Sequence, residues 1–232
     1  SGALGYGYDT QQQAINQRVP NSIEISSTKD QMIADGIQTA EIICVVKDST
    51  GNPVSGVRVN FSKEPSEMGG VSPAFGLTNS DGIITAHFTA GTISGIATVR
   101  ATVADHISVN KSTSIELVAG KPAIILLSAP SGTRVQVGGN KLPVKATVYD
   151  RFGNLVADNT EVVFKVSDRE KATISSPSTT VNGVASTSLQ SGNKSGSVDI
   201  EASIVLLPPD SSTIKSALLH LSVYGVPHIQ YN

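Results

Sequence analysis

The 232-residue sequence predicts an all-β protein built from two tandem antiparallel β-sandwiches. The first supporting observation is an internal repeat with an offset of about 100 residues. The second is a period-two alternation of apolar and polar residues between turns rich in Gly, Asn and Pro, and the third is that no stretch of about a dozen residues has helical periodicity. Each repeat is long enough to bury its own core without a metal or a disulfide.

The repeat is clearest around a polar turn, VKDSTGNPVSGVRVNF at residues 46–61, which returns as VYDRFGNLVADNTEVVF at residues 148–164. An offset of 102 residues, which becomes 101 after a one-residue insertion near residue 159 and a shortening further on, superposes Asp48 on Asp150, Gly51 on Gly153, Gly82 on Gly183 and Gly91 on Gly192. Because the turn recurs at the same place in the strand order, we interpret it as a structural signature and not as a binding loop.

The residues of this turn have predictable roles. We expect the Asp48 side chain to cap the turn, Gly51 and Asn52 to tolerate positive φ, and Pro53 to end the strand pairing because it has no amide hydrogen. The turn would then join two neighbouring strands and fix their register.

The strands on either side show which residues face the core. In residues 41–47 the inward positions are Ile42, Cys44 and Val46, and in the second copy they are Val144, Ala146 and Val148. About seven such strands in each copy, at a spacing of eight to twelve residues, predict a sandwich of immunoglobulin type. Cys44 is the only cysteine, so we expect a small buried apolar residue there and not a reactive thiol.

The predicted domain organisation has four parts. Residues 1–18 form an extended N-terminal tail, 19–119 the first immunoglobulin-like domain, 120–226 the second, and 227–232 an extended C-terminal stub that is similar to the start of a third repeat. The connection at residues 118–124 is short and has one Gly and one Pro. Because it leaves little slack, we expect the two sandwiches to form an end-to-end rod.

Charge and motifs exclude several classes of function. The net charge is −2 and the sequence has no run of like charges, so it does not predict the basic surface that binds nucleic acid or an anionic membrane. The histidines are scattered, the carboxylates are isolated, and neither a nucleophile elbow nor a phosphate loop is present. We therefore predict that the protein is not an enzyme and has no catalytic, cofactor-binding or metal-binding residues, no cofactor and no small-molecule substrate. An intramolecular isopeptide bond is not expected, because Lys47 and Lys145 should point outward.

The segments DSTGNPVSGVRVNF and TNSDGIITAHFTAGTISGIATVRATV resemble the bacterial Ig-like repeats of the intimin and invasin family. The resemblance covers most of residues 23–117, and the second copy is more diverged. It implies an extracellular or cell-surface module, associated with the outer membrane in a longer protein and used as a stalk that holds a receptor-binding domain away from the cell. The repeats do not include such a tip, so the resemblance carries over the scaffold role alone.

The candidate interface residues lie where the repeats differ or show an apolar outer face. They are Tyr6, Tyr8, Ile43, Val45, Ile229 and Tyr231. Neighbouring side chains on a strand face opposite sides of the sheet. Some side chains of three apolar runs must therefore point away from the core of a two-layer sandwich; these runs are residues 124–127, 204–207 and 218–219. Packing between the domains and an interface with another protein are both open explanations.

The function predicted from these features is a non-enzymatic structural or adhesive module of the cell surface, whose partners are neighbouring subunits or a host receptor. One alternative is a subunit of a self-assembling extracellular filament or pilus-like fibre, ordered by residues 1–18. A weaker alternative is an accessory carbohydrate-binding module, which would need a row of exposed aromatic residues from a chain with five Tyr and no Trp.

Overall fold

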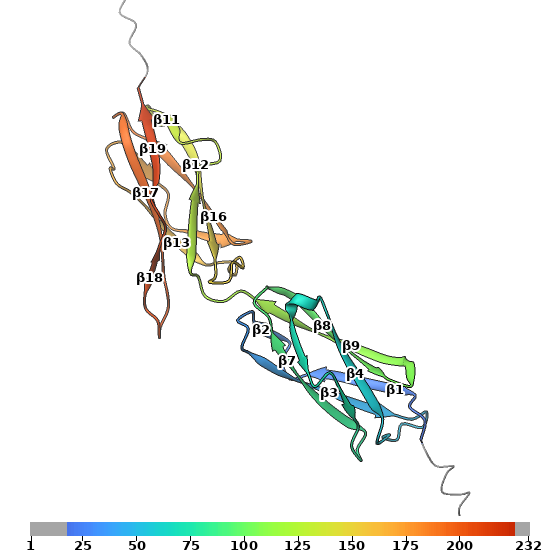
Figure 1. The fold of residues 1–232 in the computed structure, drawn as a ribbon. Coiled ribbons are helices and arrows are strands. Elements are labelled where there is room, and N and C mark those ends of the chain that lie inside the picture. Colours follow the sequence, from blue (N-terminus) through green and yellow to red (C-terminus); the bar gives the residue numbers. More distant parts are fainter. Residues whose placement is uncertain (1–17, 226–232) are drawn as a thin grey trace, which may run out of the picture. The chain divides into compact units, whose positions relative to one another are not determined.

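The structure is a computed structural model that describes residues 18–225. The chain divides into two compact units, Ser1–Leu117 and Val118–Asn232, called here the first and the second unit. Both units consist of strands joined by turns (Figure 1), and residues 18–225 contain no α-helix.

The first unit has two sheets. One has the strand order β1-β3-β7-β5 and the other β2-β9-β8-β4-β6. The elements are β1 (Ser22–Ser27), β2 (Gln31–Ile33), β3 (Thr39–Lys47), β4 (Arg58–Glu64), the 3₁₀ turn η1 (Ser66–Met68), β5 (Gly69–Ser72), β6 (Phe75–Leu77), β7 (Ile83–Ala90), β8 (Gly95–Val103) and β9 (His106–Val118).

The second unit repeats this plan with two differences, an additional short strand and a different pairing at one sheet edge. Its elements are β10 (Ile124–Ser128), β11 (Arg134–Gln136), β12 (Lys141–Tyr149), β13 (Glu161–Val166), β14 (Ala172–Ile174), β15 (Ser178–Val181), β16 (Val184–Ser191), β17 (Gly196–Val205), β18 (Thr213–Lys215) and β19 (Leu219–Tyr224). Here β15 pairs with both β13 and β16, so the strands form one continuous sheet. The corresponding strand of the first unit, β6, pairs with β4 alone.

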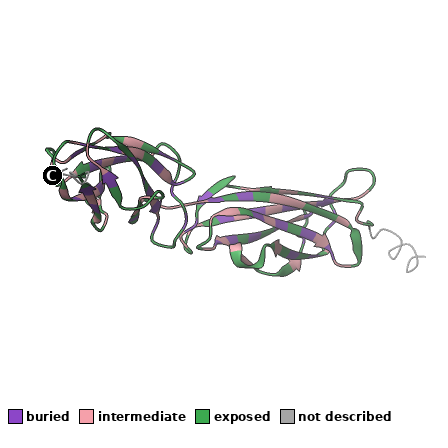
Figure 2. Ribbon diagram, turned by 90° about the horizontal axis from the view of Figure 1, so that it is seen from above, coloured by how far each residue is buried: buried purple, intermediate pink, exposed green. Residues whose placement is uncertain are grey.

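Each unit has its own core, and the alternation of the sequence sets which residues enter it. Ile42, Cys44 and Val46 of β3 have no exposed surface, and neither do Val144, Ala146 and Val148 of β12. Figure 2 shows the same alternation of buried and exposed residues along the long strands. The predicted all-β, immunoglobulin-like fold and the predicted inward faces are confirmed.

The number of strands is higher than the predicted seven in each copy. Short strands of three or four residues account for the difference: β2, β5, β6, β11, β14, β15 and β18. Such strands are too short to display a period-two pattern, and sheet pairing defines them instead of alternation. One of them, β11, pairs in parallel with β19, with Arg134 opposite Ser222 and Gln136 opposite Tyr224.

Candidate functional site

The predicted turn recurs in both units with the same hydrogen bonds. In the first unit Oδ1 of Asp48 accepts the amides of Thr50 and Asn52, each at 2.9 Å. In the second unit Oδ1 of Asp150 accepts the amides of Phe152 at 2.8 Å and Asn154 at 2.9 Å. The aspartate cap is therefore confirmed in both copies.

The backbone of the turn differs in one respect from the prediction. Gly51 has a φ of 84°, as expected, but Asn52 is not among the residues with positive φ. The prediction for Asn52 is wrong, because this residue acts through hydrogen bonds: its amide binds Asp48, and its side-chain nitrogen donates to Oγ1 of Thr50 at 2.6 Å. Pro53 forms a single β-bridge with Lys47.

Hydrogen bonds lower the pKa of both aspartates. For Asp48 the largest cause is the bond from the Thr50 hydroxyl group. Burial alone would raise the pKa of Asp150, but the bonds from the Asn154 side chain and from the amides of Gly120, Asn154 and Phe152 outweigh it and lower the pKa. Both carboxyl groups are therefore ionised at neutral pH.

The same aspartate also binds the segment that leads into each unit. The guanidinium group of Arg18 lies 3.7 Å from Oδ2 of Asp48 and donates to the carbonyl of Pro53 at 3.0 Å. In the second unit the amide of Gly120 donates to Oδ2 of Asp150 at 2.9 Å. Arg18 and Gly120 are equivalent positions at the offset of 102 residues, so a side chain in one copy and a backbone amide in the other have the same role.

A hollow of about 730 Å³ lies beside the entering segment of the first unit. Its lining includes Arg18, Val19, Arg58, Leu77 and His106. Leu77 and Val19 are 65% and 61% exposed, so the hollow combines apolar side chains with two guanidinium groups.

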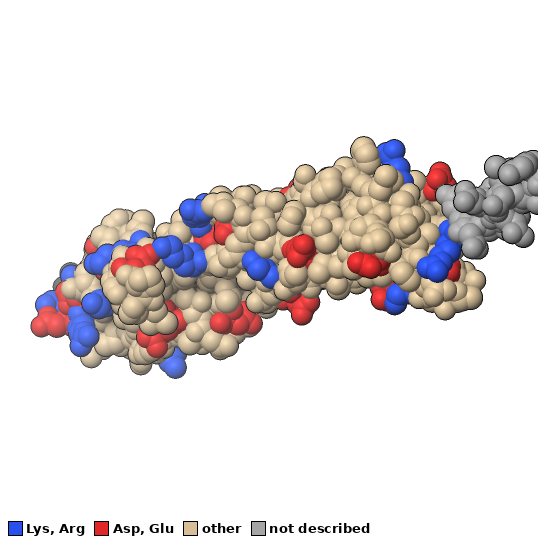
Figure 3. Space-filling model, turned by 90° about the horizontal axis from the view of Figure 1, so that it is seen from below, with Lys and Arg blue, Asp and Glu red and all other residues tan. Residues whose placement is uncertain are grey.

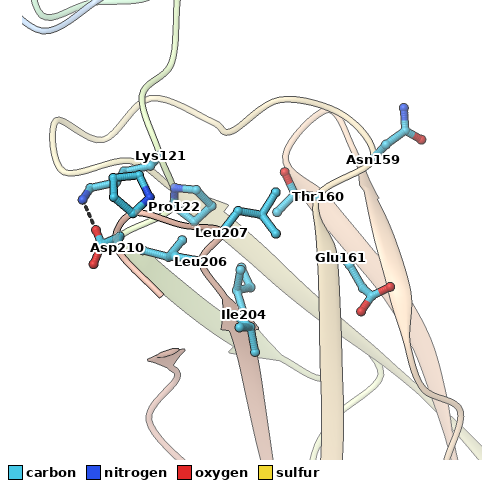
Figure 4. A pocket seen from close by; sticks show the side chains of 11 residues that line it. Lys121, Pro122, Asn159, Thr160, Glu161, Ile204, Leu206, Leu207 and Asp210 are labelled. Carbon is cyan, nitrogen blue, oxygen red and sulfur yellow. Dashed lines mark hydrogen bonds and ion pairs between the residues drawn. The ribbon is translucent and has the colours of Figure 1, made fainter. Parts of the chain in front are cut away.

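The second unit has a hollow of about 930 Å³ at the equivalent place (Figure 4). Lys121 and Pro122 line it where Val19 and Pro20 line the first hollow. Lys121 forms an ion pair with Asp210, and Leu207, which is 83% exposed, lies between this pair and Thr160 in the view. The loop after β17 makes this hollow more apolar than its counterpart.

The prediction from the sequence did not include either hollow. A signal was present, because the offset between the repeats grows from 101 at Ala202 to 106 at Leu221, which superposes on Ile115. This insertion places Leu206, Leu207 and Asp210 in the wall of the second hollow.

The three apolar runs behave as alternation requires. Ile125 and Ile204 are 4% exposed, whereas Leu126 and Val205 are 55% and 65% exposed. The prediction that these runs have an outer apolar face is confirmed.

The structure describes two of the six predicted interface residues. Ile43 and Val45 are half-buried on the outer face of β3, where Val45 lies opposite Glu24 of β1 and Ile83 of β7. Tyr6, Tyr8, Ile229 and Tyr231 lie outside the described residues. Ile43 and Val45 share one face of β3, and the interface of all six residues stays a prediction.

The described side chains form no metal site, and the two lysines considered for an isopeptide bond face outward. Residues 18–225 contain no group of three or more His, Cys, Asp and Glu side chains that could hold a metal ion. Lys47 forms an ion pair with Glu24 at 2.8 Å, and Lys145 is exposed, so both point outward as predicted. Lys and Arg are interspersed with Asp and Glu on the face shown in Figure 3. None of the helices in the described part of the chain is long and apolar enough to cross a membrane.

Comparison with known structures shows the same fold in three bacterial proteins. FdeC, an adhesin of Escherichia coli, is 22% identical with a TM-score of 0.54, and the match covers 89% of this chain and 65% of that one. Invasin, described as a bacterial integrin-binding protein, is 22% identical with a TM-score of 0.61, and the match covers 89% of this chain and 40% of invasin. For InvD of Yersinia pseudotuberculosis the values are 20% identity, a TM-score of 0.61, and 90% and 60% coverage.

The chain therefore spans between 40% and 65% of the length of these structures. A family model gives the more specific result, since the model described as "Bacterial Ig-like domain (group 1)" matches residues 22–118. The resemblance inferred from the turn and strand motifs is thereby confirmed. Residues 22–118, which make up most of the first unit, are therefore similar to the bacterial Ig-like domains of group 1.

Proposed function

We propose that the two units are a non-enzymatic structural module of a bacterial cell-surface adhesin, which acts as a stalk for a binding domain. The observation that carries this proposal is the anchoring of the entering chain by the same aspartate in each unit, Asp48 through Arg18 and Asp150 through Gly120. A stalk needs a fixed attachment where the chain enters each module, and this arrangement provides one.

The second unit is, in this proposal, a diverged copy of the first. Gly91 and Gly192 support this relationship, because each donates its amide to the residue before a short strand, Met68 at 2.8 Å and Lys171 at 2.7 Å. A Cβ atom at either glycine would lie within 2.8 Å of a backbone carbonyl oxygen, that of Glu67 or that of Glu170. The two copies therefore share a packing constraint as well as a strand pattern.

The attachment of the connecting segment supports a stiff entry into the second unit. The amide of Ala123 donates to the carbonyl of Tyr149 at 2.8 Å, the amide of Gly120 binds Asp150, and the side chain of Lys121 binds Asp210. Three of the residues between β9 and β10 are thus held to the second unit.

The relatives in the comparison support the location and the kind of partner. FdeC is an adhesin, and invasin binds an integrin according to its description. We propose a surface location for this chain and protein partners for the molecule that carries it.

A carbohydrate-binding role has less support. The large exposed aromatic residues among residues 18–225 are Phe75, Phe152 and Tyr224. An arginine covers each ring, with its guanidinium carbon 4.0 to 4.9 Å from the ring centroid. A sugar would have to displace these cation–π contacts before it could stack on a ring.

Antibodies against the folded chain test the proposed location. We expect equal staining of intact and permeabilised cells of the source bacterium, and staining only after permeabilisation would contradict a surface role. The stalk role is tested by adding the purified 232-residue chain to host cells. We expect no saturable binding by the chain alone, and saturable binding would show that these units are themselves adhesive.

A further inference from the structure

The first unit has an open sheet edge that the second unit closes. β6 is the last strand of the sheet β2-β9-β8-β4-β6, whereas its counterpart β15 lies between β13 and β16. An open edge presents unpaired backbone groups to which another strand can be added.

The hydrogen bonds of β6 show which backbone groups face outward. The carbonyl of Ala74 accepts the amide of Phe61 at 2.8 Å, and the amide of Thr78 donates to the carbonyl of Val57 at 2.9 Å. Residues 74, 76 and 78 therefore face β4, and by the alternation of an antiparallel ladder the amides and carbonyls of Phe75 and Leu77 point away from it.

The side chains of this edge are apolar and exposed. Phe75 is 53% and Leu77 is 65% exposed, and the guanidinium group of Arg58 lies 4.0 Å over the Phe75 ring. Superposing the repeats places Leu77 on Thr179 of β15, which is polar. The open edge and its apolar side chains therefore occur together in the first unit.

The described chain begins at this edge. Arg18, Val19 and Pro20 line the hollow of about 730 Å³ together with Leu77 and Arg58. Seventeen residues precede Arg18 in the sequence. At about 3.3 Å per residue, the ten residues from Arg18 back to Tyr8 could span roughly 33 Å, which is enough for the chain to turn and lie along a three-residue strand.

We propose that residues 1–17 bind the open edge of β6 in the same unit, as an added strand that carries Tyr6 and Tyr8. These two tyrosines are two residues apart and flanked by Gly5 and Gly7, so in an extended strand both side chains lie on one face. That face would pair with Phe75 and Leu77, since aromatic and apolar side chains are favourable cross-strand neighbours.

A tryptophan probe tests the proposal, because the chain has no Trp of its own. In the full chain carrying Tyr8→Trp, we expect an indole emission that is blue-shifted relative to the unfolded protein, and protection from acrylamide quenching. Adding Leu77→Ser should abolish both effects. The matched control is Ile96→Ser, an exposed apolar residue of β8 in the same sheet, which should leave both unchanged. Emission typical of free indole in the Tyr8→Trp chain would overturn the proposal.

Amide exchange provides a second test that needs no substitution at the edge. The amides of Phe75 and Leu77 should exchange more slowly in the full chain than in a chain that starts at Arg18, by roughly tenfold or more. Equal exchange in the two chains would overturn the proposal. Protection that appears only at concentrations where the chain dimerises would also overturn it, because the strand would then come from a second copy.

Discussion

Gly82 and Val46 lie in backbone contact where β7 begins. The amide of Val46 donates to the carbonyl of Gly82 at 2.9 Å, and a Cβ atom on Gly82 would lie 2.6 Å from the carbonyl oxygen of Val46. Gly82 also has a φ of 69°, a conformation that L side chains rarely adopt.

Replacing Gly82 with alanine should therefore destabilise the first unit by about 2 kcal/mol or more, through steric overlap with backbone and conformational strain. Urea unfolding measures the change. The control is Gly70→Ala, since a Cβ atom there would meet nothing within 4 Å, and its cost should stay below about 1 kcal/mol. Equal costs for the two variants would contradict the packing that the structure shows.

The hydroxyl group of Thr180 should contribute to the stability of the second unit. It accepts the amide of Thr160 at 3.0 Å and donates to the carbonyl of Ala157 at 2.8 Å, and the residue has no exposed surface. Thr180→Val keeps the shape but removes the acceptor of the Thr160 amide, and it leaves the Ala157 carbonyl with the Thr160 hydroxyl group as its donor at 2.9 Å. We therefore expect a loss of about 1 to 3 kcal/mol. Its exposed neighbour provides the comparison: Thr179→Val should change the free energy of unfolding by less than about 0.5 kcal/mol.

Acid should weaken the second unit through Asp150. The pKa of Asp150 is lower in the folded state than its usual value, so its contribution is fully present above the unfolded pKa of about 3.9 and is lost as the pH falls through the folded pKa. Unfolding measured between neutral pH and strongly acidic pH should show this decline. In Asp150→Asn the decline should be shallower, and a curve parallel to that of the unchanged chain would show that this carboxyl group has no part in it.

Cys44 should react only when the first unit unfolds. It has no exposed surface, and burial raises the pKa of its thiol to about 12, so the nucleophilic thiolate is scarce at neutral pH. Labelling with a thiol reagent should therefore be slow in buffer and fast in denaturant. As the only cysteine of the chain, Cys44 reports on the first unit alone. Rapid labelling of the folded chain would contradict its burial.

Much of the fold could be predicted because alternation and turn chemistry are local properties of the sequence. Parity identifies Ile42, Cys44 and Val46 as core residues, residue type identifies Asp48 as the turn cap, and the repeat superposes Asp150 on Asp48. The φ of Asn52 was predicted wrongly because Asn can satisfy a turn in two ways, by positive φ or by side-chain hydrogen bonds, and the sequence does not distinguish them.

The candidate sites were harder to predict because they depend on pairing between distant segments. Nothing local to Phe75 or Thr179 indicates that β6 ends a sheet while β15 joins two halves of one. The offset of 102 residues does superpose Arg18 on Gly120. Their common role could not be predicted, because Arg18 binds the aspartate through its side chain and Gly120 through its backbone amide, so the two residue types are unrelated.

The parallel pairing of β11 with β19 has a mechanical consequence. β11 follows soon after the chain enters the second unit, and β19 ends next to Gly225, the last described residue. Tension applied at the two ends of this unit would pull the two strands in opposite directions along their length. The bonds from the Ser222 amide to the Thr133 carbonyl and from the Val137 amide to the Tyr224 carbonyl, both 2.9 Å long, would then carry the load together in shear, and the unit would resist stretching instead of opening one bond at a time.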